Sequence, residues 1–336
     1  MVVPRISILI PAWNAEHTLG RALASVRRQS MSDWHCVVVD DGSDDQTRAV
    51  ARRFVLKDHR FELLCLPHRG LVESLNSGLE QCRGALVARF DADDVMHQHR
   101  LARQCEHLDR EPELDAVGCH VRLFPRPELK PKRIAYETWL NSLQSSDEVF
   151  RDRFVECPVA HPSLTIRREC LSGFGYADRG WPEDYDLVLR VLGAGRQIAV
   201  TPAPLLRWRD GSTRLSRSST TYALERFVAC KAHYLAGTWL QGETQYLLWG
   251  YGDTGRNLYR ALASLGKHPA AIIELDPRKL GQTIQGAKVI APQAIRSHAE
   301  RHKIVISVSG QNARSDARLL ASGLGLREGS DFVCAA

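Results

Sequence analysis

Short apolar runs alternate with amphipathic segments along the first 90 residues of the chain. Runs rich in branched apolar side chains predict buried strands at residues 6–10, 36–39, 61–66 and 85–90. Apolar residues that recur with a helical period predict helices between them, at 18–29, 45–54 and 71–81. Strands that alternate with helices indicate an α/β fold with a mixed, mostly parallel sheet flanked by helices.

This pattern weakens at residues 120–155, where three prolines lie among basic residues. We interpret this stretch as a variable insertion rather than sheet core. A helical period returns at 222–240, and a fresh strand-turn-helix pattern begins at Tyr246. The expected organisation is a first domain at 1–218, a linking helix at 219–241 and a small Rossmann-like α/β domain at 242–336.

Composition places the chain among ordinary globular proteins. With 336 residues, 44% hydrophobic and 25% charged, it is long enough for two domains. The net charge of +6 is spread along the chain, which favours phosphate-bearing ligands or an anionic membrane surface, and we expect no nucleic-acid partner.

Cysteine usage and hydropathy indicate the compartment. The nine cysteines are odd in number and never form CxxC, which argues against a disulfide framework and a zinc site. The apolar run after Arg5 is shorter than the core of a signal peptide, and no run approaches the roughly 20 apolar residues of a membrane span. We expect a cytoplasmic protein, and attachment to the inner face of the membrane and assembly into a homo-oligomer are left open.

Three acidic clusters follow predicted strands or turns. They contain Asp40 and Asp41, then Asp91, Asp93 and Asp94, then Glu183, Asp184 and Asp186. Ligands of open α/β sheets gather at the carboxyl ends of strands, so the first two clusters should face one crevice. Crowded carboxylates repel one another, and a hard cation such as Mg²⁺ or Mn²⁺ relieves that repulsion. We predict Asp91 and Asp93 as ligands of such an ion, while Asp94 and Asp186 could instead cap a helix or lie on a solvated face.

The ordered motifs resemble a known family over roughly residues 5–215. They read ISILIPAWNAEHTLGRALASVRRQS, VVVDDGSDDQT, RGLVESLNSGL, FDADD and WPEDYDLVLRV. This order resembles the inverting glycosyltransferases of family 2, which have the GT-A fold and take part in polysaccharide or glycoconjugate synthesis.

The resemblance implies a role for individual residues. Base and ribose of a nucleotide-sugar donor would lie against Pro11, Ala12, Asn14, Glu16, Asp40 and Asp41. Asn76 would lie beside the donor, in a segment where Leu75 replaces the family's Arg. Asp91, Ala92 and Asp93 match the DxD motif that binds the metal and the donor diphosphate, and Asp184 matches the general base. A UDP-sugar is the expected donor and a glycan or lipid-linked hydroxyl the expected acceptor.

Other side chains are further candidates for the same reaction. His161, Trp181 and Glu183 are predicted on the acceptor side, and Arg207 and Arg209 at the leaving phosphates. Each has a structural alternative, since a His before a Pro can serve a loop, a Trp can pack, and an Arg can be a surface charge.

The segment after Tyr246 carries a glycine motif of its own. Gly250, Gly252 and Gly255 form a GxGxxG turn between a strand and a helix, and Asp276 follows about twenty residues later. This fingerprint keeps an NAD-dependent oxidoreductase open as an alternative, and a non-catalytic nucleotide-sugar-binding protein is a third. The segment also resembles the nucleotide-sugar-binding domains of certain sugar acyltransferases, which implies a binding, positioning or assembly role.

Overall fold

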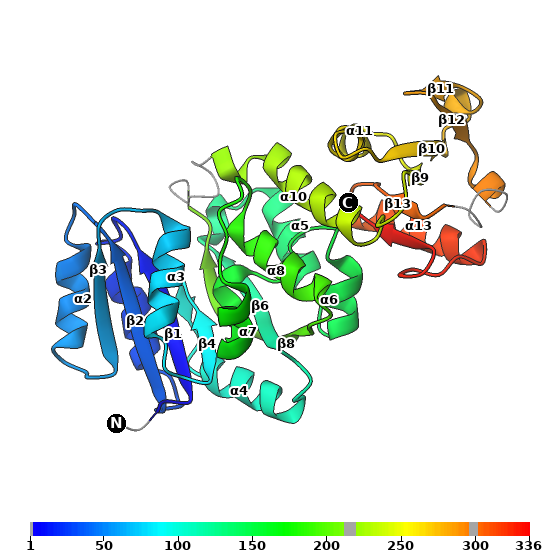
Figure 1. Cartoon of the computed structure of the whole chain (residues 1–336). Helices are drawn as coiled ribbons and strands as arrows, with labels where there is room; N and C mark the ends of the chain where they lie inside the picture. Colours follow the sequence, from blue (N-terminus) through cyan, green and yellow to red (C-terminus); the bar gives the residue numbers. More distant parts are fainter. Residues whose placement is uncertain (1–2, 212–219, 296–301) are drawn as a thin grey trace. The chain divides into compact units, whose positions relative to one another are not determined.

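The computed structural model describes residues 3–211, 220–295 and 302–336 (Figure 1). The chain forms two compact units. The first comprises Met1–Val149, Val159–Arg179 and Arg190–Arg214, and the second Phe150–Pro158, Gly180–Leu189 and Leu215–Ala336. The predicted boundary between residues 218 and 219 lies outside the described residues. The three-part domain organisation therefore stays a prediction.

The first unit is built on an eight-stranded sheet in the order β3-β2-β1-β4-β7-β6-β8-β5. Its strands are β1 (Ile6–Ala12), β2 (Trp34–Asp41), β3 (Phe61–Leu66), β4 (Leu86–Arg89), β5 (Val95–Met96), β6 (Ala116–Phe124), β7 (Thr165–Arg167) and β8 (Ile198–Arg209). β1, β2, β3 and β4 run parallel, as do β6 and β8, whereas β7 and β5 pair antiparallel with their neighbours. The predicted mixed α/β sheet is confirmed.

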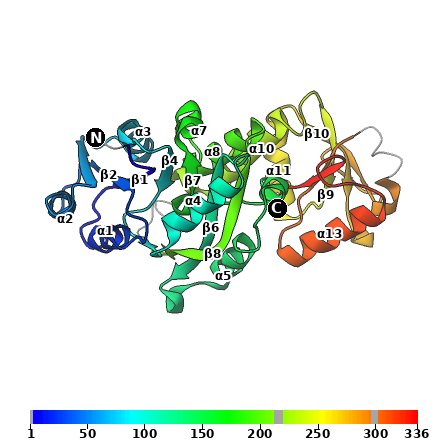
Figure 2. The ribbon, with the colours of Figure 1, turned by 90° about the horizontal axis from the view of Figure 1, so that it is seen from below.

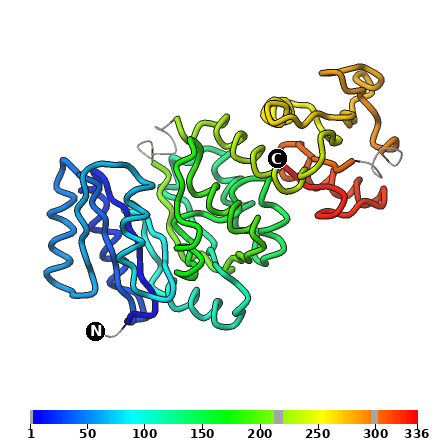
Figure 3. The backbone as a smooth tube through the Cα atoms, in the orientation of Figure 1, coloured from blue at the N-terminus to red at the C-terminus, as the bar shows by residue number. Residues whose placement is uncertain are grey.

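Helices flank this sheet. They are α1 (Leu19–Arg27), α2 (Thr47–Val55), α3 (Leu71–Gln81), α4 (Arg100–Arg110), α5 (Pro131–Leu140) and α7 (Arg168–Phe174). α6 (Ser146–Asp152) and α8 (Glu183–Gly193) contain residues of both units. Figure 2 shows α1 and α3 on opposite sides of β1 and β2. The chain trace in Figure 3 leads from β3 through α3 back to β4, which lies beside β1.

The close contact of α3 with the sheet depends on a residue without a side chain. A Cβ at Gly78 would come within 2.4 Å of Leu9 and 2.6 Å of Val39. The predicted strand at 61–66 and the predicted helix at 71–81 are confirmed residue for residue.

The prediction that residues 120–155 lie outside the sheet core is wrong for its first part. Residues 120–124 belong to β6, which pairs along its length with β8. Val121 and Leu123 are buried while Arg122 between them is exposed, so this stretch has the alternation of a strand with one covered face. The prolines that suggested a loop begin at Pro125, one residue after the strand ends.

The second unit holds a six-stranded sheet in the order β11-β12-β10-β9-β13-β14. Its strands are β9 (Gln245–Trp249), β10 (His268–Ile273), β11 (Thr283–Ile284), β12 (Ala287–Ile290), β13 (Ile304–Ile306) and β14 (Phe332–Cys334). Its helices are α10 (Leu224–Gly237), α11 (Asp253–Ala263) and α13 (Gln311–Gly323). All neighbours pair in parallel except β11 with β12. Among the described residues, no helix combines the length and the apolar character needed to cross a bilayer.

Candidate active site

The predicted donor residues lie where neighbouring parallel strands of the first unit end. β1 runs between β2 and β4, with Ala12 opposite Asp40. The backbone N–H of Phe90, just after β4, donates to the carbonyl of Leu9 at 3.0 Å. Because parallel strands end on the same edge, the loops after β1, β2 and β4 share one edge of the sheet.

The loops after β1 and β2 are joined by hydrogen bonds between side chains and backbone. Asn14 has a φ of 47°, a left-handed conformation that asparagine tolerates better than most residues. The bonds run from Asn14 N to Ser43 Oγ (3.0 Å), Asp44 N to Asn14 Oδ1 (3.0 Å), Ala15 N to Thr47 Oγ1 (2.6 Å), Glu16 N to Asp45 Oδ2 (3.0 Å) and Gln46 N to Glu16 Oε2 (2.8 Å). The predicted residues Asn14 and Glu16 therefore both bind the opposite loop.

Asp40 stabilises its own turn. Its side chain is fully buried and accepts from Ser43 N at 3.3 Å and from Arg48 Nε at 2.9 Å. These partners give Asp40 a structural role in the loop after β2, since a buried carboxylate requires hydrogen-bonding or charged partners.

Asp41 binds a third loop, the one that precedes α3. Its carboxylate accepts from the backbone N–H groups of Arg69 and Gly70, both at 2.9 Å, and lies 2.8 Å from Nδ1 of His68. The ring of His68 stacks on Trp13, with centroids 4.5 Å apart, and Trp13 is 47% exposed. Local spacing in the sequence does not reveal His68, because its link to this edge depends on a contact with Asp41, 27 residues away.

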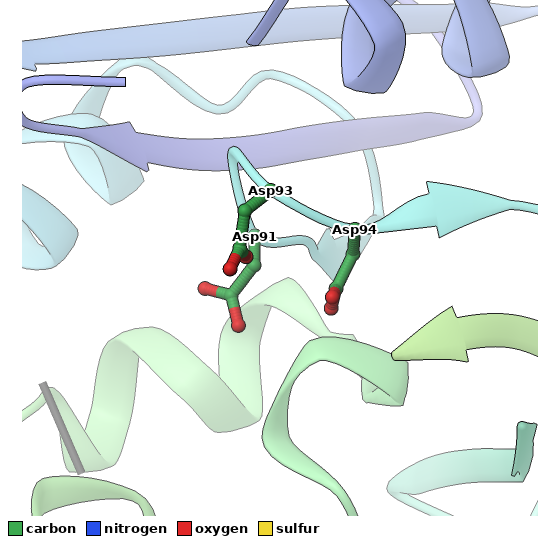
Figure 4. A group of neighbouring side chains, drawn as sticks. All are labelled: Asp91, Asp93 and Asp94. Carbon is green, nitrogen blue, oxygen red and sulfur yellow. The ribbon is translucent and has the colours of Figure 1, made fainter. Parts of the chain in front are cut away.

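Three carboxylates gather in the turn after β4. Asp91, Asp93 and Asp94, here called the aspartate cluster, each offer an oxygen within 4.8 Å of the others (Figure 4). Asp91 and Asp93 are partly exposed, whereas Asp94 is buried. Oδ1 of Asp94 accepts from the backbone N–H of Arg209 at 2.7 Å, so Asp94 joins this turn to the end of β8. Ala92 is buried between the first two aspartates.

Arginines surround the aspartate cluster. Arg89 forms an ion pair with Asp91, and Nε of Arg209 donates to the backbone carbonyl of Asp93 at 3.0 Å. Arg207, the other arginine predicted at the phosphates, is exposed and lies with its guanidinium 5.1 Å from the ring centre of Phe124. Of the two predicted arginines, Arg209 is therefore the one that contacts the cluster.

Asn76 and His161 meet at one residue, Tyr176. The Asn76 amide accepts from Tyr176 N at 2.9 Å and donates to Tyr176 O at 3.0 Å. Nε2 of His161 lies 3.0 Å from the Tyr176 hydroxyl. Burial, together with the charge of Arg89, holds the pKa of His161 well below its ordinary value, so the ring is neutral at pH 7. Both predicted residues thus bind within the protein, and Asn76 fixes the backbone after α7.

The third acidic motif begins α8. Asp184, the predicted base, lies in the first turn and accepts from Tyr185 N at 2.7 Å. Its neighbour Asp186 is buried and accepts from Trp181 Nε1 at 2.8 Å and from the Tyr234 hydroxyl at 2.6 Å. Glu183 is buried and accepts from the Tyr222 hydroxyl. Trp181, predicted on the acceptor side, thus uses its indole N–H to hold this motif.

The glycine turn of the second unit, residues 250–255, lies at the carboxyl end of β9. A Cβ at Gly255 would lie 2.2 Å from Gly250 O, and one at Gly250 would lie 2.8 Å from Val308. Nothing lies within 4 Å of a Cβ at Gly252. Close packing therefore requires two of the three motif glycines.

Two acidic residues follow β10, Glu274 and Asp276, and they have different partners. The Asp276 carboxylate accepts hydrogen bonds from the backbone N–H and the guanidinium of Arg278. These hydrogen bonds lower the pKa of Asp276 to about 2. Glu274 instead accepts from the backbone N–H of Tyr251 at 3.0 Å, within the glycine turn. The ligand of this region stays a prediction.

Comparison with known proteins agrees with this geometry. Residues 7–172 match the model of Glycosyl transferase family 2. The amylovoran biosynthesis glycosyltransferase AmsE of Erwinia amylovora is 28% identical in an alignment of 219 residues that covers 63% of this chain and 78% of AmsE. The UDP-Glc:alpha-D-GlcNAc-diphosphoundecaprenol beta-1,3-glucosyltransferase WfgD of Escherichia coli is 34% identical over 100 residues, 30% of this chain and 39% of WfgD.

Solved structures show the same fold at low sequence identity. S. aureus TarS residues 1–349, in complex with UDP-GlcNAc, superposes with a TM-score of 0.57 at 15% identity, over 77% of this chain and 71% of that one. The mannosyltransferase PcManGT from Pyrobaculum calidifontis, in complex with GDP-Man and Mn²⁺, gives a TM-score of 0.53 at 17% identity, over 79% and 70% of the two chains.

The sheet therefore has the GT-A fold, and the family match together with the relatives defines a glycosyltransferase. Residues 7–172 match the model of this family, in agreement with the family that the order of the motifs predicted. The prediction of a transferase is confirmed in preference to an oxidoreductase or a non-catalytic binding protein.

Proposed function

We propose that this glycosyltransferase moves a sugar from a nucleoside diphosphate sugar to an acceptor hydroxyl, with inversion at the anomeric carbon. The observation that carries the proposal is the aspartate cluster, which lies on the sheet edge that also bears the joined loops after β1 and β2. The complexes of TarS with UDP-GlcNAc and of PcManGT with GDP-Man support a nucleotide-sugar donor. We favour a UDP-sugar, because the WfgD name also specifies one.

The aspartate cluster fits Mg²⁺ or Mn²⁺. Carboxylate oxygens are the ligands that these hard cations prefer, and Mg²⁺ usually takes one or two carboxylates and completes its shell with water and phosphate oxygens. Asp94 is buried and bonded to β8, which leaves the partly exposed Asp91 and Asp93 as the proposed ligands. When bound, the ion would supply Lewis-acid stabilisation of the charge that develops on the leaving diphosphate.

The chain's own residues supply the rest of the mechanism. The Trp13 and His68 rings form an exposed stacked pair beside Asp41, a surface suited to a nucleotide base. We assign Asp184 as the general base that takes the proton from the acceptor hydroxyl, a role worth about 10²- to 10⁴-fold in rate. The hydrogen bonds to Glu183 and Asp186 hold the first turn of α8, and with it Asp184, in one orientation.

A transfer assay on Asp184→Asn tests this assignment. We expect the rate to fall by about 10²-fold or more, with unchanged affinity for a UDP-sugar measured by calorimetry. Asp147→Asn is the matched control, since Asp147 is exposed and occupies the same second position of α6. Full activity of Asp184→Asn would remove it as the base, and tighter binding of GDP-sugars than UDP-sugars in the same titrations would replace the proposed donor.

We further propose a glycan or lipid-linked acceptor in envelope polysaccharide synthesis. The names of AmsE and WfgD refer to a polysaccharide and to a diphosphoundecaprenol-linked sugar, and both support this class. The net charge of +6 is compatible with work at an anionic inner membrane face.

A further inference from the structure

The strand that leads into the aspartate cluster ends on a buried arginine. Arg89 is the last residue of β4 and is 4% exposed. Its Nη1 pairs with Oδ1 of Asp91, one of the two proposed metal ligands. A guanidinium keeps its proton at any ordinary pH, so this positive charge is permanent.

A second buried arginine contacts the backbone of the first. Arg100, at the start of α4, is fully buried, and its Nη2 donates to the backbone carbonyl of Arg89 at 2.9 Å. Burial lowers the pKa of Arg100, the charges of Asp94 and Asp91 raise it, and the charge of Arg89 lowers it. These charges therefore act on one another, and positive charge beneath the aspartate cluster offsets part of its repulsion.

We propose that Arg89 is a built-in competitor of the divalent cation for Asp91, which holds the aspartate cluster together without metal and weakens metal binding. This inference rests on the proposed metal site at Asp91 and Asp93. Two effects act in the same direction. A dication on Asp91 is repelled by the Arg89 charge a few ångströms away, and Asp91 must share or give up its ion pair with Arg89 when it binds the ion.

This competition has a consequence for donor binding. An aspartate cluster already balanced by Arg89 attracts a free divalent ion weakly, whereas a diphosphate brings further negative charge. The ion then binds mainly together with the donor, so the donor would complete the metal site.

The test measures Mn²⁺ binding by electron paramagnetic resonance on the full chain without nucleotide. We expect Arg89→Gln to bind Mn²⁺ about tenfold more tightly than the wild type. The reason is that a neighbouring charge typically changes the affinity of a carboxylate for a cation by about one or more powers of ten, and this substitution removes the positive charge beside Asp91. Arg89→Lys retains the charge and should stay within a few-fold of the wild type. Arg196→Gln is the matched control, because Arg196 pairs with Asp115 at 3.3 Å near the opposite end of β8 from Arg209, and it should leave the affinity unchanged.

Weaker or unchanged Mn²⁺ binding by folded Arg89→Gln would overturn the role of Arg89. Failure of the proposed metal site gives a different result, in which the wild type and Asp91→Asn bind Mn²⁺ equally. Should Arg89→Gln not fold without metal, the inference requires that Mn²⁺ restore its folding, because a ligand of the native state stabilises it. It also requires that the double variant Asp91→Asn/Arg89→Gln fold without metal, because this variant has no charge at residue 91 that lacks a partner. Failure of either requirement rejects the inference.

Discussion

Turns at the carboxyl ends of parallel strands occur in both units, and they differ in what holds them together. In the first unit, carboxylates and amides bind neighbouring loops, as Asp41 binds Arg69 and Gly70. In the second unit, Ser307 Oγ donates to Gly250 O at 2.7 Å and Glu274 accepts from Tyr251 N, and the glycine turn after β9 also packs too closely for a Cβ at Gly255. Polar side chains bind both sets of turns, whereas the glycine motif also requires the absence of a side chain at two of its positions.

This difference changes how strongly each motif indicates a ligand. Gly250 and Gly255 have a packing reason that needs no ligand, since a Cβ at either would overlap protein atoms. The aspartate cluster has no comparable packing reason, because crowded carboxylates oppose folding unless other charges offset them. A GxGxxG turn is therefore weaker evidence of binding than a cluster of acids at a strand end.

The largest expected contrast between the two regions is in catalysis. Asp93→Asn should lower the transfer rate by on the order of 10²- to 10³-fold, because it removes a proposed ligand of the ion that stabilises the leaving group. Asp253→Asn, at the start of α11 within the glycine turn, changes a side chain that is 92% exposed and should leave the rate unchanged. Initial rates at saturating Mn²⁺ measure both, and an equal loss in the two variants would erase the contrast.

Stability should show the opposite contrast. Gly255→Ala places a Cβ 2.2 Å from Gly250 O and should destabilise the second unit by about 1–3 kcal/mol. Gly252→Ala, where the space is open, should be close to neutral. Thermal unfolding of the full chain compares them. If Gly252→Ala were the more damaging change, packing would not be the reason for the motif.

The smallest expected effect depends on pH and belongs to the first unit. Because burial and Arg89 lower the pKa of His161, the unfolded chain takes up a proton more readily than the folded one below pH ~6.5. The stability contributed by neutral His161 is complete above that pH and is lost as the pH falls. Between pH 7 and 5, the wild type should lose about 1–2 kcal/mol more than His161→Gln, measured as melting temperatures at both pH values. Parallel curves would show that His161 does not titrate in this range.

Local pattern predicted much of the fold. The helix at 71–81 follows from periodicity, because its buried residues recur at helical spacing. The strand at 61–66 follows from its apolar run, since only Phe61 in it is buried. The extent of β6 was missed, since His120 and Arg122 interrupt its apolar run and its partner β8 lies about 80 residues further along the chain. Strand pairing at such separation leaves little trace in a local window.

The sequence predicted which residues belong to the candidate site more completely than it predicted which of them contact one another. The aspartate cluster could be recognised because acids directly follow a predicted strand. The partners of Asn76 and His161 could not, because both converge on Tyr176 and the Asn76 contact spans 100 residues. Arg89 carried a usable signal, since an arginine within an apolar run just before FDADD is a natural counter-charge.

The hydrogen bonds between residues 14–16 and 43–47 bear on how nucleotide preference could change. Each loop depends on the other for its shape, and neither needs a bound donor to adopt that shape. A substitution in one loop would disturb the other. An enzyme with a new base preference would therefore need coordinated changes in both loops.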